Sequence, residues 1–133
     1  MKIPAHQLSS SVQKALLPCY LITGDEPLLV QEALDTIRIG ARQLEFGLRE
    51  LYVASPGFDW LELINSSANM SLFAEKRIIE LRLPSGKPGR QGSKTILELL
   101  ENADDKLLIL ISTPKLNRST AASKWVKTAE SRG

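Results

Sequence analysis

The sequence has few of the side chains that hold metal ions or form disulfide bonds. Cys19 is its only cysteine and His6 its only histidine. A single thiol excludes an internal disulfide, and two soft ligands are too few for a structural zinc site. No catalytic triad can be assembled, because Cys19 lies in an apolar run where a thiol is more often inert packing. We therefore expect no metal, no cofactor and no catalytic residues.

The sequence also lacks long apolar runs and an excess of one charge. No stretch approaches the roughly 18 consecutive apolar residues of a membrane span, and no basic segment followed by an apolar run opens the chain. Seventeen lysines and arginines oppose fifteen aspartates and glutamates. The resulting net charge of +2 demands neither nucleic acid nor an anionic membrane as a partner. These absences are typical of a cytoplasmic protein.

What the sequence does contain is enough apolar material for one domain. Of its 133 residues, 43% are apolar, so we expect residues 1–133 to form a single globular domain. Four short apolar runs without alternating polarity predict strands, at residues 19–23, 51–54, 77–83 and 107–111. After each run, apolar residues recur at the spacing of an amphipathic helix. This pattern indicates a mainly parallel sheet covered on both faces, a three-layer α/β sandwich.

Local signals predict where several helices begin and end. Gly47 is expected to close the long helix after the first strand. Asp59, with Glu62 three residues on, forms a capping box for the next helix. The remaining expectations are a Gly- and Pro-rich loop over residues 84–93, a helix around Ile96, and a final helix from near Ser119 with Ala122 on its inner face.

The turn after the first strand is where an α/β protein would bind a nucleotide. Residues 24–27 offer one glycine, no lysine and two carboxylates, whereas a phosphate loop needs several glycines, a lysine and a Ser or Thr. The carboxylates would repel a triphosphate but suit the first turn of a helix. They could instead hold Mg²⁺ beside a phosphorylatable aspartate. Leu83, Pro84 and Ser85 stand where that aspartate would be needed.

A second near-match to a phosphate loop covers residues 89–95. The pattern requires glycine directly before the lysine, but Ser93 precedes Lys94. We interpret this segment as a mobile surface loop in which Lys87, Arg90 and Lys94 are solvated. An ATPase that uses Lys94 and Thr95 stays open as an alternative.

Large apolar side chains gather in the connection before the third strand. Met70, Leu72 and Phe73 occupy three of four successive positions there. Connections usually run over the surface, and exposed aliphatic and aromatic groups on a turn are typical anchors for a partner's pocket. The alternative is that Met70 and Phe73 fold back as a lid on the sheet edge.

The same segment carries a resemblance to a known family. Asn69-Met70-Ser71-Leu72-Phe73 resembles the bacterial clamp-binding pentapeptide, whose usual form is Gln-Leu-Ser/Asp-Leu-Phe. Residues 20–32, 68–77 and 107–111 are similar to the delta subunit family of the bacterial DNA polymerase III clamp loader. The resemblance runs over essentially the whole chain.

The resemblance implies the N-terminal domain of a longer subunit, with an AAA+ (P-loop NTPase-like) fold that has lost its phosphate loop. It also implies a non-catalytic subunit of the polymerase holoenzyme that binds the beta sliding clamp and helps to open the ring for loading on DNA. Leu72 and Phe73 are then expected to enter a hydrophobic pocket on the clamp, with Met70 beside them and Ser71 as a small spacer. Asn69 departs from the usual glutamine.

The implied partners are the beta sliding clamp and, mainly through downstream domains, the other clamp-loader subunits, delta prime and gamma/tau. DNA is expected as a partner only within the full complex, and a membrane is not expected. Two alternatives stay open: a degenerate P-loop ATPase, and a protein-binding scaffold unrelated to clamps in which Leu72 and Phe73 are buried.

Overall fold

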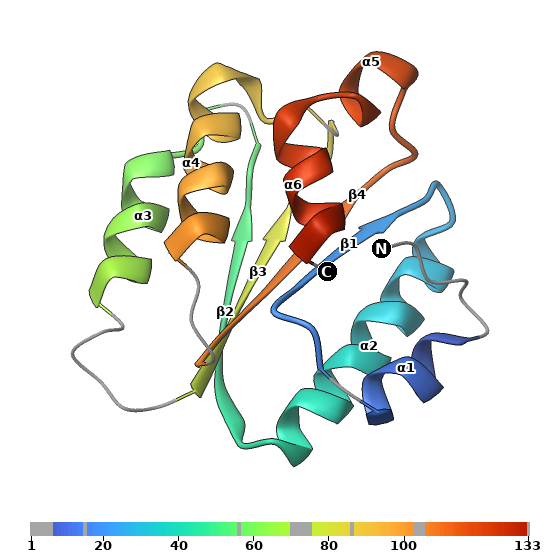
Figure 1. Ribbon diagram of the computed structural model, residues 1–133. Helices are drawn as coiled ribbons and strands as arrows, with labels where there is room; N and C mark the ends of the chain where they lie inside the picture. Colours follow the sequence, from blue (N-terminus) through green and yellow to red (C-terminus); the bar gives the residue numbers. More distant parts are fainter. Residues whose placement is uncertain are drawn as a thin grey trace.

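The computed structural model describes residues 7–14, 16–55, 57–69, 76–85, 87–102 and 106–132. At its centre is a four-stranded sheet in which every neighbouring pair of strands is parallel (Figure 1). The strands are β1 (Cys19–Thr23), β2 (Phe46–Val53), β3 (Lys76–Arg82) and β4 (Leu107–Thr113), in the order β1-β4-β3-β2. The two edges of the sheet are therefore β1 and β2.

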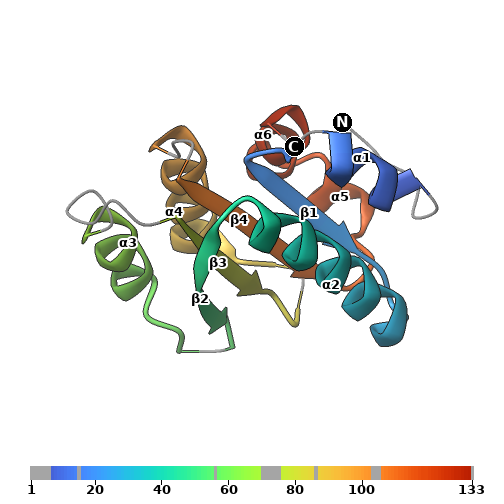
Figure 2. The same ribbon diagram turned by 90° about the horizontal axis from the view of Figure 1, so that it is seen from below.

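Helices cover both faces of this sheet (Figure 2). On one face lie α1 (Leu8–Lys14) and α2 (Pro27–Gln43). On the other lie α3 (Trp60–Asn69), α4 (Gly89–Asn102) and α6 (Lys124–Arg132), with the short α5 (Arg118–Ala121) before α6. The predicted three-layer α/β sandwich with a parallel sheet is confirmed. None of the described helices is long and apolar enough to cross a membrane.

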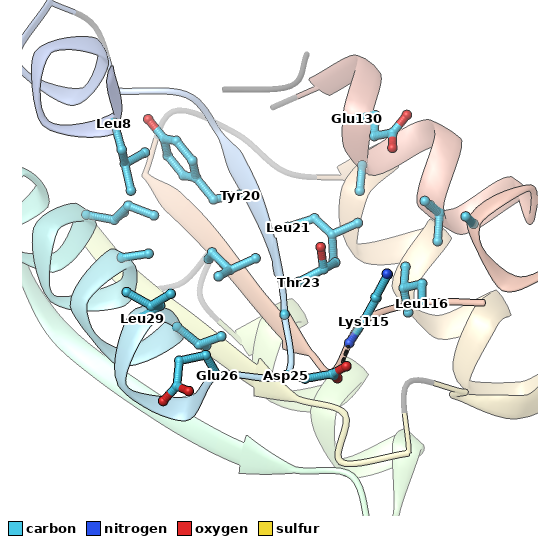
Figure 3. Close-up of a pocket in the computed structure, with 18 residues that line it drawn as sticks. Leu8, Tyr20, Leu21, Thr23, Asp25, Glu26, Leu29, Lys115, Leu116 and Glu130 are labelled. Atoms are coloured by element: carbon cyan, nitrogen blue, oxygen red, sulfur yellow. Dashed lines mark hydrogen bonds between the residues drawn. The ribbon is translucent and has the colours of Figure 1, made fainter. Parts of the chain in front are cut away.

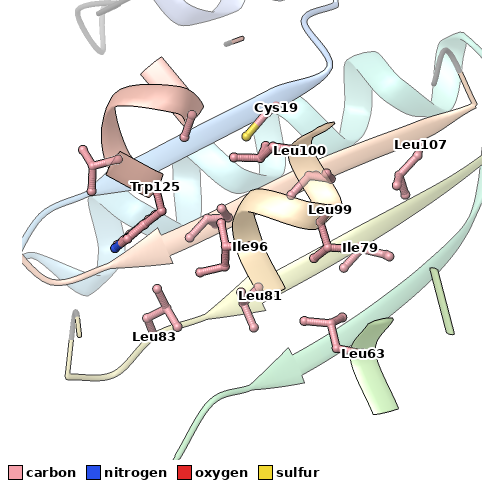
Figure 4. Close-up of a cluster of buried hydrophobic side chains, with 14 of the residues drawn as sticks. Cys19, Leu63, Ile79, Leu81, Leu83, Ile96, Leu99, Leu100, Leu107 and Trp125 are labelled. Carbon is pink, nitrogen blue, oxygen red and sulfur yellow. The ribbon is translucent and has the colours of Figure 1, made fainter. Parts of the chain in front are cut away.

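The side chains of β3 show how the two faces of the sheet differ. Ile79 and Leu81 point toward α3, α4 and α6, where they belong to one continuous apolar cluster (Figure 4). Because successive side chains of a strand point to opposite faces, Ile78 and Glu80 point toward α2. Ile78 packs with α2 side chains in a second cluster, and Glu80 is completely buried. Ile79 and Leu81 thus belong to a continuous apolar cluster on one face, and the other face contains a completely buried carboxylate.

The end of α2 and the start of β2 come earlier than the sequence predicted. α2 ends at Gln43, and the left-handed conformation expected at Gly47 is taken by Glu45, whose φ is 71°. β2 then begins at Phe46 rather than near residue 51. The Phe46 side chain is buried in the α2-side cluster, and such packing commonly overrides local turn signals.

The loop predicted over residues 84–93 is also shorter than expected. α4 begins at Gly89, so Arg90 and Gly92 are helical. Gly92 lies against Trp60 so closely that a Cβ at this position would be 2.6 Å from the indole ring. This packing joins residues far apart in the sequence, and local composition does not reveal it. Lys87, Arg90 and Lys94 are exposed as predicted, the last two on a helix rather than a loop.

Two further helix ends give one confirmation and one correction. Asp59 caps α3 as predicted, since its Oδ1 accepts the backbone N–H groups of Leu61 at 3.1 Å and Glu62 at 3.3 Å. The single final helix was wrong. Asn117 caps the separate helix α5, and Ala122 is its exposed C-cap residue rather than part of an inner face.

Candidate protein-binding site

A groove runs along the open edge of β1 (Figure 3). Its volume is about 710 Å³, and apolar side chains of β1, α2 and α6 form much of its wall. At the carboxyl end of β1, Asp25 Oδ1 accepts the backbone N–H of Lys115 at 2.9 Å. This N–H group, which could otherwise donate to a phosphate, therefore already donates to a carboxylate. The negative charges of Asp25 and Glu26 would also repel an anion. The groove offers poor chemistry for a nucleotide phosphate.

The near-match to a phosphate loop has the wrong geometry for holding phosphate. Residues 89–95 form the first half of α4, with Lys94 exposed and Thr95 buried. A phosphate loop directs successive backbone N–H groups at its ligand, whereas helical N–H groups beyond the first turn donate to carbonyls of their own helix. This segment gives no support to the ATPase alternative.

The described residues also offer little to metal or thiol chemistry. No three of their His, Cys, Asp and Glu side chains gather where they could hold a metal ion. Burial raises the pKa of the Cys19 thiol to about 12, so this thiol stays protonated at neutral pH and is a poor nucleophile.

Of the five residues of the predicted pentapeptide, only Asn69 belongs to the described residues, as the last residue of α3. Met70, Ser71, Leu72 and Phe73 lie outside the described residues. On the other side the description resumes at Lys76, the first residue of β3. The end of α3 and the start of β3 lie at the end of the sheet where the strands begin, opposite the end of β1 that leads into α2 (Figure 1). The role of the pentapeptide stays a prediction.

The helix that leads into this segment is firmly held at its start. Trp60 and Leu63 of α3 are buried in the apolar cluster shared with α4. The Trp60 ring meets the Phe58 ring edge-on, with centroids 4.9 Å apart, and packs against Gly92 of α4 without room for a Cβ. Because tightly packed interiors deform little, α3 has a fixed position on α4.

The strand that follows the segment is anchored on both faces of the sheet. Lys76 Nζ donates to the carbonyl of Leu44 at 3.0 Å and lies 5.4 Å from the centroid of the Phe46 ring. A cation is favoured there, because the carbonyls at the end of α2 carry partial negative charge. On the opposite face, Arg77 Nη1 donates to Glu50 Oε1 at 2.7 Å. The start of β3 is thereby held from two sides.

Tyr52 connects the start of α3 with the start of β3. Its hydroxyl donates to Glu50 Oε2 at 2.7 Å, and its ring meets the Phe58 ring edge-on at 6.2 Å. Contacts therefore run from Trp60 through Phe58, Tyr52 and Glu50 to Arg77. Sequence reasoning missed this series of contacts, because its members come from three separate parts of the sequence. Only the alternation of side chains between the two faces along the full length of β2 could have suggested it.

The fold defines a three-layer α/β domain, and comparison with known proteins identifies its family. Residues 20–133 match the family described as DNA polymerase III, delta subunit. Because this match covers most of the sequence, the chain belongs to that family.

Individual relatives agree with the family. The DNA polymerase III subunit delta of Escherichia coli is 28% identical over 125 residues, which cover 94% of this chain and 36% of that protein. The DNA polymerase III subunit delta of Haemophilus influenzae is 28% identical over 124 residues, which cover 93% of this chain and 36% of that protein. The chain thus spans about a third of the length of the curated relatives it matches.

Proposed function

We propose that this chain is the clamp-binding domain of a clamp-loader delta subunit, and that it binds the beta sliding clamp through Asn69–Phe73, hereafter the clamp-binding segment. Leu72 and Phe73 enter a hydrophobic pocket on the clamp, Met70 packs beside them, and Ser71 is a spacer. The observation that carries the proposal is this pentapeptide in a member of the delta subunit family. The elements on either side of it are held by the rest of the domain.

Such an anchor would supply a large share of the binding energy. Burying a Leu–Phe pair contributes about 3 to 6 kcal/mol before the costs of association are subtracted. Firmly held flanks reduce one of those costs, because less of the chain has to be ordered on binding. A micromolar affinity corresponds to about 8 kcal/mol, so contacts beyond this pair contribute as well.

Selective binding would also account for a role in opening the clamp ring. A protein that fits an open or relaxed ring interface better than the closed one shifts the ring toward opening, by as much as its difference in affinity for the two states. No hydrolysis is needed in this domain. The energy of an ATP cycle would come from the other clamp-loader subunits, delta prime and gamma/tau, which we propose as further partners together with DNA in the full complex.

We further propose that the domain is an AAA+ type that does not use a phosphate loop, and that it is a non-catalytic subunit of the polymerase holoenzyme. Two observations support this proposal. Asp25 and Glu26 follow β1 where phosphate would be expected, and residues 89–95 are helical. If the domain nevertheless binds ATP saturably, and if Lys94→Ala abolishes that binding, this part of the proposal is wrong.

The decisive experiment is titration of purified sliding clamp into this protein and into the Leu72→Ala/Phe73→Ala variant. We expect the variant to lose at least about 30-fold in affinity, the size of a hot-spot effect of 2 kcal/mol. Leu28→Ala/Leu29→Ala is the matched control, because this leucine pair is 64% and 62% exposed on α2 and should leave affinity unchanged. Circular dichroism checks the fold of each variant.

Three outcomes separate the proposal from its rivals. Loss of binding by a folded Leu72→Ala/Phe73→Ala variant supports the anchor. Unchanged binding by that variant shows that the anchor lies elsewhere, and absence of binding by the wild type contradicts the clamp-binding role. Unfolding of the variant favours the scaffold alternative, in which both side chains are buried.

The departure at Asn69 gives a second, smaller test. Its amide is one methylene shorter than that of the glutamine usual at this position. We expect Asn69→Gln to strengthen clamp binding by about 1 kcal/mol, roughly fivefold, if the longer side chain gains one hydrogen bond. A weaker or unchanged affinity would show that the polar contact at this position is not limiting.

A further inference from the structure

The second edge of the sheet carries a surface that shares no residue with the clamp-binding segment. β2 is an edge strand, and two of its apolar side chains, Leu51 and Val53, are 46% and 44% exposed. Beside them lie the side chains of Arg49, which is 43% exposed, and of Arg82 on β3, which is 39% exposed. We call these four residues the β2 strip. Arginine is enriched at protein interfaces, and exposed apolar side chains beside it can be covered by a partner.

A buried carboxylate orients the arginines of this strip. Glu80 is completely buried, and Arg49 and Arg82 approach its carboxylate oxygens at 3.3 Å and 3.2 Å. Arg38 of α2 also bonds to Glu80, and it bonds to Asp35 as well. Three guanidinium groups therefore face only two carboxylates. Each guanidinium has five N–H donors, so the strip keeps positive charge and hydrogen-bond donors directed at solvent.

The backbone of β2 adds a second kind of recognition. The N–H of Ala54 donates to the carbonyl of Arg82 at 2.8 Å. In a regular strand alternate residues direct their backbone groups to opposite sides, so Arg49 and Leu51 direct theirs away from β3, toward the open edge. Their side chains lie on the α2 side of the sheet. The same residues thus offer unpaired backbone groups and exposed side chains.

We propose that the β2 strip binds an extended acidic segment of a partner protein, which adds to the sheet as a strand beside β2. Its backbone would pair with the open edge, its carboxylates would bond to Arg49 and Arg82, and its apolar side chains would cover Leu51 and Val53. Charge complementarity selects an acidic occupant. The exposed aliphatic pair and the strand edge favour a peptide over nucleic acid, whose phosphate backbone would leave both uncovered.

This surface is distinct from the clamp-binding segment, and the test does not depend on clamp binding. The probe is a fluorescent peptide with glutamate, valine, valine and glutamate at every second position and threonine between them, so that these four side chains lie on one face of the added strand; it is titrated with the protein and followed by anisotropy. The same peptide with lysine in place of each glutamate is the charge control. We expect saturable binding of the acidic peptide alone, weakened by salt, and unaffected by Leu72→Ala/Phe73→Ala.

Variants locate the binding surface. Arg49→Glu/Arg82→Glu should weaken acidic-peptide binding by at least about tenfold, and Leu51→Ser/Val53→Ser should weaken it as well. The matched control is Lys87→Glu/Lys94→Glu, which makes the same charge change at exposed positions before and on α4, and it should change affinity less than about twofold. Circular dichroism verifies folding of every variant.

Several results would overturn the proposal. Binding of both peptides alike would mean nonspecific association, and an equal loss in the Lys87/Lys94 variant would mean that only net charge matters. No saturable binding of the acidic peptide would remove the site. A short DNA duplex that displaces the peptide and loses affinity in the Arg49/Arg82 variant would identify the strip as a nucleic-acid surface instead.

Discussion

The two faces of the sheet are built from the same strands but follow different chemistry. Under α3, α4 and α6, Ile79 and Leu81 of β3 belong to a continuous apolar cluster, and the ion pair of Arg77 with Glu50 is partly exposed. Under α2, the same strand contributes Glu80, which is completely buried and bonded to arginines from α2, β2 and β3. The apolar face is closed over by helices, whereas the charged face leaves the β2 strip half exposed.

This difference suggests that one face mainly contributes to the stability of the fold and the other to the orientation of its arginine side chains. Apolar burial is non-directional and scales with the area removed from water, so the first face is suited to holding α3 and the start of the clamp-binding segment. A buried ion cluster costs desolvation and often adds little net stability. It does fix the directions of its side chains. We infer that the first face mainly stabilises the fold, and that the second mainly orients arginines.

The largest expected effect comes from the apolar face. Ile79→Ala should lower the free energy of unfolding by about 4 kcal/mol, because a completely buried side chain is replaced by a cavity. Chemical denaturation measures the change. Ile39→Ala is the control, since Ile39 is 61% exposed and should cost no more than about 0.5 kcal/mol. Similar losses for both variants would mean that the core does not lie where the structure has it.

A smaller loss is expected on the charged face. Glu80→Ala should cost about 2 to 3 kcal/mol, because it leaves the arginines without their shared carboxylate, although Arg49 and Arg82 can turn to water. Added salt should reduce this loss by screening the arginines from one another, while the loss from Ile79→Ala should not depend on salt. If both losses respond to salt alike, the contrast between the faces is wrong.

The contact between α3 and α4 gives the third effect. Gly92→Ala should cost about 1 to 2 kcal/mol, because the new methyl group would lie 2.6 Å from the Trp60 ring and overpacking forces displacement. Since α3 leads into the clamp-binding segment, clamp affinity should fall as well. Gly47→Ala is the control, because no atom lies within 4 Å of its Cβ position. A stable Gly92→Ala protein with normal clamp affinity would contradict this role for α3.

The sequence could predict those features of the fold that depend on neighbouring residues, but not those that depend on packing between residues far apart in the sequence. The apolar runs that became β1 and β4, and the cap at Asp59, depend on neighbouring residues, and these predictions are confirmed. The start of β2 at Phe46 and of α4 at Gly89 depends on packing against distant elements, which local composition does not record. The chain order alone also leaves the order of the strands open.

The same limit applies to the candidate sites. The clamp-binding segment could be proposed from sequence because its five residues are contiguous and resemble a known pattern, and it stays a prediction. The β2 strip could not be found this way. Its arginines come from β2 and β3, and they meet only because Glu80 is buried between them. A lone glutamate in the apolar run of residues 77–83 was the one available signal.

The smallest effect concerns the rim of the charged face. A hydrogen bond from Arg38 and, to a lesser extent, one from Gln31 lower the pKa of the exposed Asp35 carboxyl below its ordinary value of 3.8. A carboxyl group whose pKa is lower in the folded state stabilises the fold at pH values above its unfolded pKa. This contribution is lost as pH falls through the folded pKa, so the loss of stability lies below pH 3.8. NMR titration of the carboxyl carbon should give this low midpoint.

Arg38→Met should return the midpoint toward 3.8, and Gln31→Ala should do so to a lesser extent. A midpoint that Arg38→Met leaves unchanged would show that Arg38 is not held between Asp35 and Glu80, and the ordered arginines of the β2 strip would lose one of their supports.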